Sequence, residues 1–184
     1  MKRLARLLLC LSSLSGCHTG NDVPIYYSLP DFSLTDQAGK AVTLHDLTGK
    51  VWVADFIFTH CAGTCPLMTQ EMHKLQEALP SDIRLVSFTV DPERDTPRVL
   101  AAYAEEHGAN SNRWLFLTGD KQALYDVCMK GFRLPLDAEG GTPSEPVAHS
   151  TRFVLVDKHN QIRGYYSLTE DEELKRLASD AKRL

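Results

Sequence analysis

The sequence has no apolar run long enough to cross a bilayer and no excess of basic residues. Its 184 residues carry 20 lysines and arginines against 24 aspartates and glutamates, a formal charge of −4. Three of the basic residues lie within residues 1–16, where there is no acidic residue, so the rest of the chain is more acidic still. Without a basic patch to neutralise phosphates, we expect no nucleic-acid partner.

Internal repeats and low-complexity segments are also absent. The hydrophobic fraction of 43% and the charged fraction of 24% are ordinary for a globular protein. A chain of this length buries a core of useful size. We therefore expect a single folded domain, which the patterns described below place over residues 31–184.

Residues 1–16 have the pattern of an export signal, with a basic start and a short apolar stretch at 7–14. A bilayer core needs about 20 apolar residues, and this run is much shorter, which argues against an uncleaved signal anchor. The Leu-Ser-Gly-Cys box at 14–17 resembles a bacterial lipobox. We expect a lipid on Cys17, a tether over 17–30, and an extracytoplasmic, membrane-anchored domain, periplasmic or on an outer face.

Cysteines are few, and fewer still remain in the folded domain once the predicted signal peptide and lipid anchor are set aside. Of the five, Cys10 leaves with the signal peptide and Cys17 carries the lipid, so three remain in the domain. Cys61 and Cys65 are close enough in sequence to pair, which leaves Cys128 as an odd thiol. An extracytoplasmic location would allow a disulfide to persist.

Apolar patterns and turn signals alternate strands with helices along the rest of the chain. We expect a hairpin at 31–44, strands at 51–58, 83–90 and 114–117, helices at 66–79, 97–107 and 120–130, a loop at 134–148, a hairpin at 152–168 and a helix at 169–183. This order predicts an α/β domain with a parallel sheet core and antiparallel edge strands.

The pair Cys61 and Cys65 lies between a predicted buried strand and a predicted helix. On a helical turn, residues at i and i+4 share one face, with α-carbons roughly 6 Å apart, so the thiols can form a disulfide or clasp one soft ion. A helix N-terminus lowers thiol pKa values, which favours the thiolate. A purely structural disulfide is the weaker interpretation because so short a loop removes little chain entropy. This is where a thioredoxin-like fold keeps its reactive site, and we predict that fold, with a central mixed sheet flanked by helices and an N-terminal β-hairpin.

A metal site needs more than two sulfurs, so a third ligand is required. His149 directly precedes the strand at 152–156, a position that faces the cysteine pair in a thioredoxin-like fold. The residues alone leave it open whether His149 is a ligand or a structural residue at the start of a strand. Asp91, which follows the strand at 83–90, either supports the ligands through a hydrogen bond, acts as a weak hard ligand, or serves a turn. Asp95 is expected to be a turn or cap residue.

These segments together resemble the Sco/SenC family. The marks are Thr59-His60-Cys61 with Cys65-Pro66, the segment Asp-Pro-Glu-Arg-Asp-Thr-Pro at 91–97, and His149-Ser150, and the resemblance runs from about Phe32 to the end. It implies a thioredoxin-fold copper protein that delivers copper to, or reduces the cysteines of, the binuclear copper centre of cytochrome c oxidase.

The resemblance also implies a ligand set and partners. It makes Cys61, Cys65 and His149 the ligands of one copper per chain, as Cu(I) or Cu(II), and the copper-bearing oxidase subunit the acceptor, with a periplasmic thiol reductant as a further partner. The alternative is a metal-free thiol–disulfide reductase that uses Cys61 and Cys65 as a redox-active pair. A copper buffer or sensor stays open, whereas a thiol peroxidase would need an arginine close to the pair, and none lies close in sequence.

Overall fold

A mixed β-sheet forms the centre of the computed structural model, which describes residues 22–137 and 148–184. Within those residues, the sheet has eight strands, in the spatial order β1 (Tyr27–Ser28), β10 (Gln161–Ser167), β9 (Arg152–Val156), β4 (Trp52–Ile57), β5 (Arg84–Thr89), β6 (Trp114–Thr118), β2 (Ser33–Asp36) and β3 (Ala41–Thr43). Strands β4, β5 and β6 are parallel, and the strands on either side pair antiparallel. The predicted parallel core with antiparallel edges is therefore correct.

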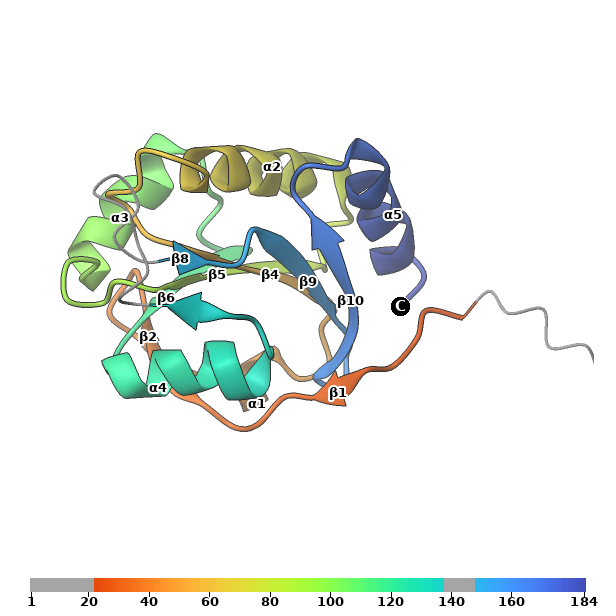
Figure 1. Cartoon of the computed structure of the whole chain (residues 1–184), viewed down its shortest axis with the longest axis horizontal. Coiled ribbons are helices and arrows are strands. Elements are labelled where there is room, and N and C mark those ends of the chain that lie inside the picture. The colour runs from red at the N-terminus through yellow and green to blue at the C-terminus, as the bar shows by residue number, and fades with distance from the viewer. Residues whose placement is uncertain (1–21, 138–147) are drawn as a thin grey trace, which may run out of the picture.

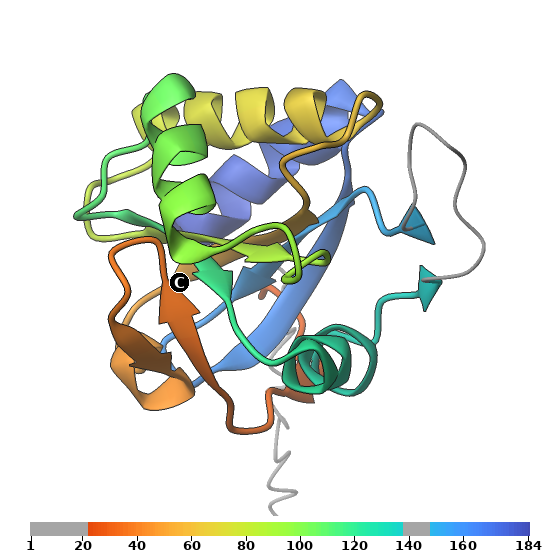
Figure 2. The same ribbon diagram turned by 90° about the vertical axis from the view of Figure 1, so that its left-hand side faces the viewer.

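Helices cover both faces of this sheet (Figure 1). They are α1 (Leu44–Leu47), α2 (Cys65–Ala78), α3 (Pro97–Glu106), α4 (Lys121–Asp126), the π-helical turn η1 (Val127–Gly131) and α5 (Asp171–Ala181). Helices α2, α3 and α5 lie on one face and α4 lies on the other, as the view turned by 90° also shows (Figure 2). No helix in the described part of the chain is long and apolar enough to span a membrane.

Helix boundaries follow the capping residues closely. The Thr96 hydroxyl accepts a hydrogen bond from the Val99 N–H at the start of α3, and the Asp120 carboxylate accepts one from the Ala123 N–H at the start of α4. Two expectations were wrong in detail. The helix predicted to run to residue 130 changes to π geometry at Val127, and the last helix, expected over 169–183, runs from Asp171 to Ala181.

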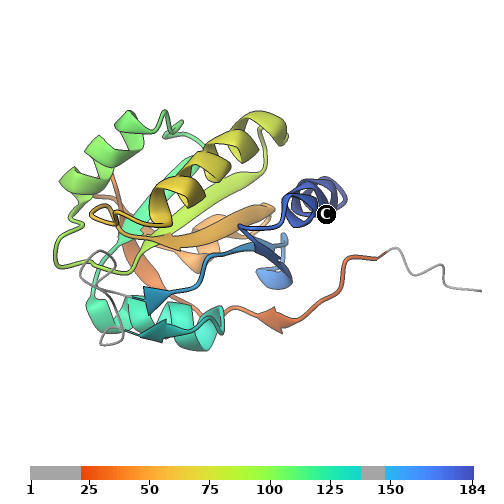
Figure 3. The ribbon, with the colours of Figure 1, turned by 45° about the horizontal axis from the view of Figure 1, so that its top comes forward.

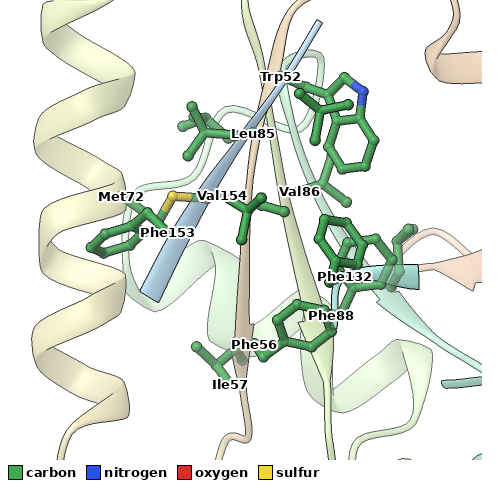
Figure 4. Packing of buried hydrophobic residues seen from close by; sticks show 14 of the residues in the cluster. Trp52, Phe56, Ile57, Met72, Leu85, Val86, Phe88, Phe132, Phe153 and Val154 are labelled. Carbon is green, nitrogen blue, oxygen red and sulfur yellow. The ribbon is translucent and has the colours of Figure 1, made fainter. Parts of the chain in front are cut away.

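The hydrophobic core lies on both sides of β4, all six residues of which are buried. On the face away from α2, the ring of Phe56 stacks on Phe88 with centroids 5.2 Å apart, and Phe132 packs edge-on against both (Figure 4). On the other face, Met72 of α2 lies near Phe153 of β9 (Figure 4). Each such side chain contributes roughly 2–3 kcal/mol through burial, so the strand that leads to Cys61 is held rigidly.

The segment expected to be a loop at 134–148 contains short strands at both ends. Strand β7 (Leu136–Asp137) pairs antiparallel with β8 (Ala148–His149), with Leu136 opposite His149. The prediction of an uninterrupted loop was therefore wrong at its ends. Backbone pairing across a large sequence interval fixes these strands, and a Gly- and Pro-rich pattern does not reveal such pairing.

Candidate metal centre

The two cysteines of the motif lie at the junction of β4 and α2. Strand β4 ends at Ile57, and the chain then turns through the Thr59–Thr64 loop into α2, whose first residue is Cys65. Both thiols are buried, with Cys61 7% and Cys65 0% exposed. They are not joined in a disulfide, and the side chain of Cys61 interacts with that of Cys65. Two soft sulfur donors therefore lie together at one helix terminus.

Burial controls the protonation of Cys65. Desolvation raises the pKa of this thiol far above its ordinary value, and the neighbouring Cys61 side chain raises it further. The expectation that the helix N-terminus would favour the thiolate was wrong for Cys65, because desolvation outweighs the partial charge of the helix end. A thiolate at this position needs a nearby positive charge, and a bound cation is the strongest source of one.

Asp95 fastens the loop that carries Cys61. Its buried carboxylate accepts hydrogen bonds from the Thr59 N–H at 3.2 Å, the Thr59 hydroxyl at 2.6 Å and the Thr89 hydroxyl at 2.5 Å. Thr89 is the last residue of β5, so the bonds tie the loop after β4 to the loop after β5. Asp95 lies in the turn after β5, as expected, where its N–H donates to the Asp91 carbonyl. The alternative cap role was wrong, since Thr96 caps α3 and the Asp95 side chain holds Thr59.

Asp91 has a local partner of its own. Its carboxylate accepts a hydrogen bond from Arg94 Nη1 at 3.0 Å, and its backbone N–H donates to the Thr89 hydroxyl at 3.0 Å. The backbone carbonyl of Asp91 also accepts from the N–H groups of Arg94 and Asp95. These contacts describe a turn residue, and a role for Asp91 beside the metal ligands stays a prediction.

A buried polar group beneath the cysteines was missed by the sequence analysis. The Thr69 hydroxyl donates to the Cys65 carbonyl at 3.0 Å and shares a hydrogen bond of 2.8 Å with the Tyr103 hydroxyl. Asp55 of β4 is fully buried, and burial raises the pKa of its carboxyl to about 7. Neither carboxyl oxygen of Asp55 meets a hydrogen-bond partner of good geometry among the described residues. Its only sequence signal was an acid inside the apolar run at 51–58.

The third predicted ligand is placed only by its backbone. His149 ends β8, and β8 lies at the same end of the molecule as the loop that precedes α2, in views from different directions (Figures 1 and 3). Its side chain lies outside what the structure describes. Among the described side chains, no group of three histidine, cysteine or acidic residues surrounds a metal position, so ligation by His149 stays a prediction.

The remaining cysteines lie away from this site or outside the description. Cys128 is buried in η1, where its thiol lies 3.7 Å from the Leu134 carbonyl and desolvation raises its pKa to about 12. Residues 1–16 and Cys17 fall before the first described residue, so the predicted signal peptide, its cleavage and the lipidation stay predictions.

The fold and the motifs together identify the family. The family model described as SCO1/SenC matches residues 26–184. This chain belongs to the SCO1/SenC family. A SCO1 protein homolog of Bacillus subtilis (strain 168) is 36% identical over 163 residues, which cover 86% of this chain and 83% of that protein. The resemblance inferred from the cysteine, Asp-Pro and His-Ser segments is therefore confirmed.

Solved Sco/SenC structures share the fold. A SCO1/SenC family lipoprotein from Bacillus anthracis superposes with a TM-score of 0.78 at 34% identity, covering 86% of this chain and 95% of that one. BsSco, described as a Sco cytochrome c oxidase assembly protein with a disulfide switch, gives 0.77 at 35% identity, covering 88% and 95%. Bradyrhizobium japonicum ScoI with copper bound gives 0.71 at 27% identity, covering 85% and 99%. The predicted thioredoxin-like fold is thereby confirmed.

Proposed function

We propose that this protein is an extracytoplasmic copper chaperone that binds one copper ion through Cys61, Cys65 and His149. The main support is the buried Cys61–Cys65 pair at the start of α2, whose side chains interact. Two thiolates and an imidazole are soft ligands that select Cu(I), and imidazole also suits Cu(II). The same donors leave a position open for an incoming ligand, which suits transfer rather than storage.

The protonation state of Cys65 favours a metal-bound sulfur over a free thiolate. The raised pKa of Cys65 keeps its thiol protonated at neutral pH, so loading releases protons as the sulfurs bind. A Cys61–Cys65 disulfide would form by loss of two protons and two electrons to an oxidant, and it would leave no thiolate to bind copper. Copper affinity therefore depends on the redox state of the pair.

The acceptor in this proposal is the copper-bearing subunit of cytochrome c oxidase, with a periplasmic thiol reductant keeping the pair reduced. Membership of a family that contains a cytochrome c oxidase assembly protein supports the acceptor class. A lipid on Cys17 would keep the domain beside the membrane, and a relative described as a lipoprotein supports that anchor.

The metal-free alternative is a thiol–disulfide reductase that acts on periplasmic or oxidase cysteines. A copper titration of the reduced and the oxidised domain separates the two. The chaperone predicts one tightly bound copper per reduced chain and none on the disulfide form. In a deletion strain it predicts an oxidase defect that is largest at low copper, whereas normal oxidase at every copper level with impaired periplasmic thiol reduction would favour the reductase.

A further inference from the structure

A cavity of about 530 Å³ lies beside the strand that follows His149. Three tyrosines and two arginines form much of its wall: Tyr26, Tyr27, Tyr165, Arg133 and Arg152. They come from the β1 segment, β10, the turn after η1 and the first residue of β9. A cavity of this size is within the range of binding pockets, and its walls offer both aromatic surface and positive charge.

Arg133 is held in an unusual backbone conformation that fixes it at this cavity. Its φ of +54° lies in the left-handed region, which costs a non-glycine residue about 1 kcal/mol or more. Its neighbours maintain it, because the Phe132 carbonyl accepts a hydrogen bond from the Tyr165 hydroxyl at 3.0 Å and the Leu134 N–H donates to the Cys128 carbonyl at 3.1 Å. The guanidinium then lies 3.5 Å from the centre of the Tyr27 ring.

Neither arginine of the cavity has a carboxylate partner among the side chains that the structure describes. Neither Arg133 nor Arg152 takes part in an ion pair with any described residue, and no acidic side chain lines the cavity among those described. The chain as a whole has a charge of −4. A positively charged cavity on an acidic protein offers a specific site for a negatively charged ligand.

We propose that this cavity binds an acidic segment of a partner protein, with its carboxylates on Arg133 and Arg152 and its apolar side chains against the tyrosine rings. Arginine guanidinium groups pair carboxylates in two parallel hydrogen bonds, and stacked tyrosine supplies apolar contact. A flat membrane surface would not fill a concave site, so an extended peptide fits better than a lipid headgroup layer. Arg152 follows His149 by three residues and begins β9, the strand that pairs with β4.

This inference adds recognition of a partner protein to the proposed function. Only the biological purpose of the contact rests on that function, whereas the binding itself does not. Its test therefore uses the copper-free, reduced domain. Binding is measured by fluorescence anisotropy with three labelled 12-residue peptides of one design, each with two tryptophans and four variable positions filled by Glu, Gln or Lys. Copper stoichiometry is measured separately on every variant, so failure of this site and failure of the copper site are distinguishable.

The Glu peptide is expected to bind wild type at least tenfold more tightly than the Gln or Lys peptide, and more weakly as salt rises. Arg152→Glu and Arg133→Glu should each reduce that affinity at least tenfold and leave copper stoichiometry unchanged. Arg98→Glu on α3, an exposed residue outside the cavity, is the matched control and should change affinity less than twofold. Arg133→Glu changes a residue with a strained backbone, and its loss of binding could come from misfolding. Arg152→Gln leaves that residue unchanged and tests the site independently.

Equal binding of the Glu and Gln peptides, or an equal loss in Arg98→Glu, would overturn the proposal. So would tight, arginine-dependent binding to phosphatidylglycerol vesicles without peptide binding, which would assign the site to a membrane. Competition by millimolar phosphate without any preference for the Glu peptide would assign it to a small anion instead.

Discussion

The Thr59 hydroxyl donates a hydrogen bond to the Asp95 carboxylate at 2.6 Å, although the two residues are 36 positions apart in the sequence. Asp95 is fully buried and also accepts from Thr89 at the end of β5. The loop that carries Cys61 is thus fastened to the neighbouring strand before any metal binds, and that rigidity should favour both folding and copper affinity.

We therefore expect Asp95→Ala to destabilise the domain by about 3 kcal/mol, because one buried and two partly buried donors lose their acceptor. Copper affinity should fall with it as the loop loosens. Urea unfolding and competition with a copper chelator measure the two effects. Glu93→Ala, which removes an exposed carboxylate that pairs with the exposed Lys121, is the control and should be nearly neutral. A neutral Asp95→Ala would contradict the role given to this carboxylate.

Asp55 should make stability depend on pH in one direction. Burial raises its pKa from 3.8 to about 7 in the folded protein. Below pH 4 the carboxyl is protonated in both states; between pH 4 and 7 it ionises only when unfolded, so stability falls as pH rises, and above pH 7 the loss is complete. Three pKa units correspond to roughly 4 kcal/mol.

The variant Asp55→Asn should remove this dependence and be more stable than wild type at pH 8. Unfolding free energies of both proteins from pH 4 to pH 8 check the slope. Parallel curves for the two proteins would mean that Asp55 is ionised at neutral pH in the folded state.

Copper binding should need each of the three proposed ligands. We expect Cys61→Ala, Cys65→Ala and His149→Ala each to weaken copper binding by roughly tenfold or more, because two donors rarely complete a site. His159→Ala, in the exposed turn between β9 and β10, is a histidine control that should not change affinity. Near wild-type affinity in His149→Ala would remove that residue from the ligand set.

Cys128 should stay outside the redox chemistry. Desolvation raises its pKa to about 12, so at pH 8 only roughly one thiol in ten thousand is a reactive thiolate. Iodoacetamide should leave Cys128 unmodified in the native protein and label it in urea. Mass mapping after mild oxidation should find a Cys61–Cys65 disulfide, and a dominant bridge to Cys128 would refute the pairing.

Local patterns predicted the elements that depend on local signals. The hairpin of β2 and β3 follows from its turn, where Asp36 accepts from the N–H groups of Ala38 and Lys40 and Gly39 takes a φ of +80°. The buried strand β4 follows from its apolar run. Edge strand β1 has only two residues and forms by pairing with β10, so no local pattern reveals it.

The environment of the cysteine pair was predictable only in part. The sequence spacing correctly predicted that the side chains of Cys61 and Cys65 lie together. Their burial depends on the whole fold, and it raises the pKa of Cys65, where a lowered pKa was expected. The partners of Asp95 and Thr69 come from other strands and helices, so their roles depend on tertiary contacts. A hydrogen bond between residues 36 positions apart has no signature in a single sequence.

Strands β4, β5 and β9 are neighbours, and the ends of β4 and β5 and the beginning of β9 all lie at one end of the sheet. Three distant stretches of chain must therefore pair before the site is assembled. Only then do the loop that carries Cys61, the segment around Asp95 and the residues that join β8 to β9 come together. A polypeptide still emerging from the ribosome, or threading through an export channel, has the thiols without the surroundings that orient them. For the proposed chaperone, this order of events would defer metal loading until export and folding are complete, so copper would be acquired in the compartment where it is used.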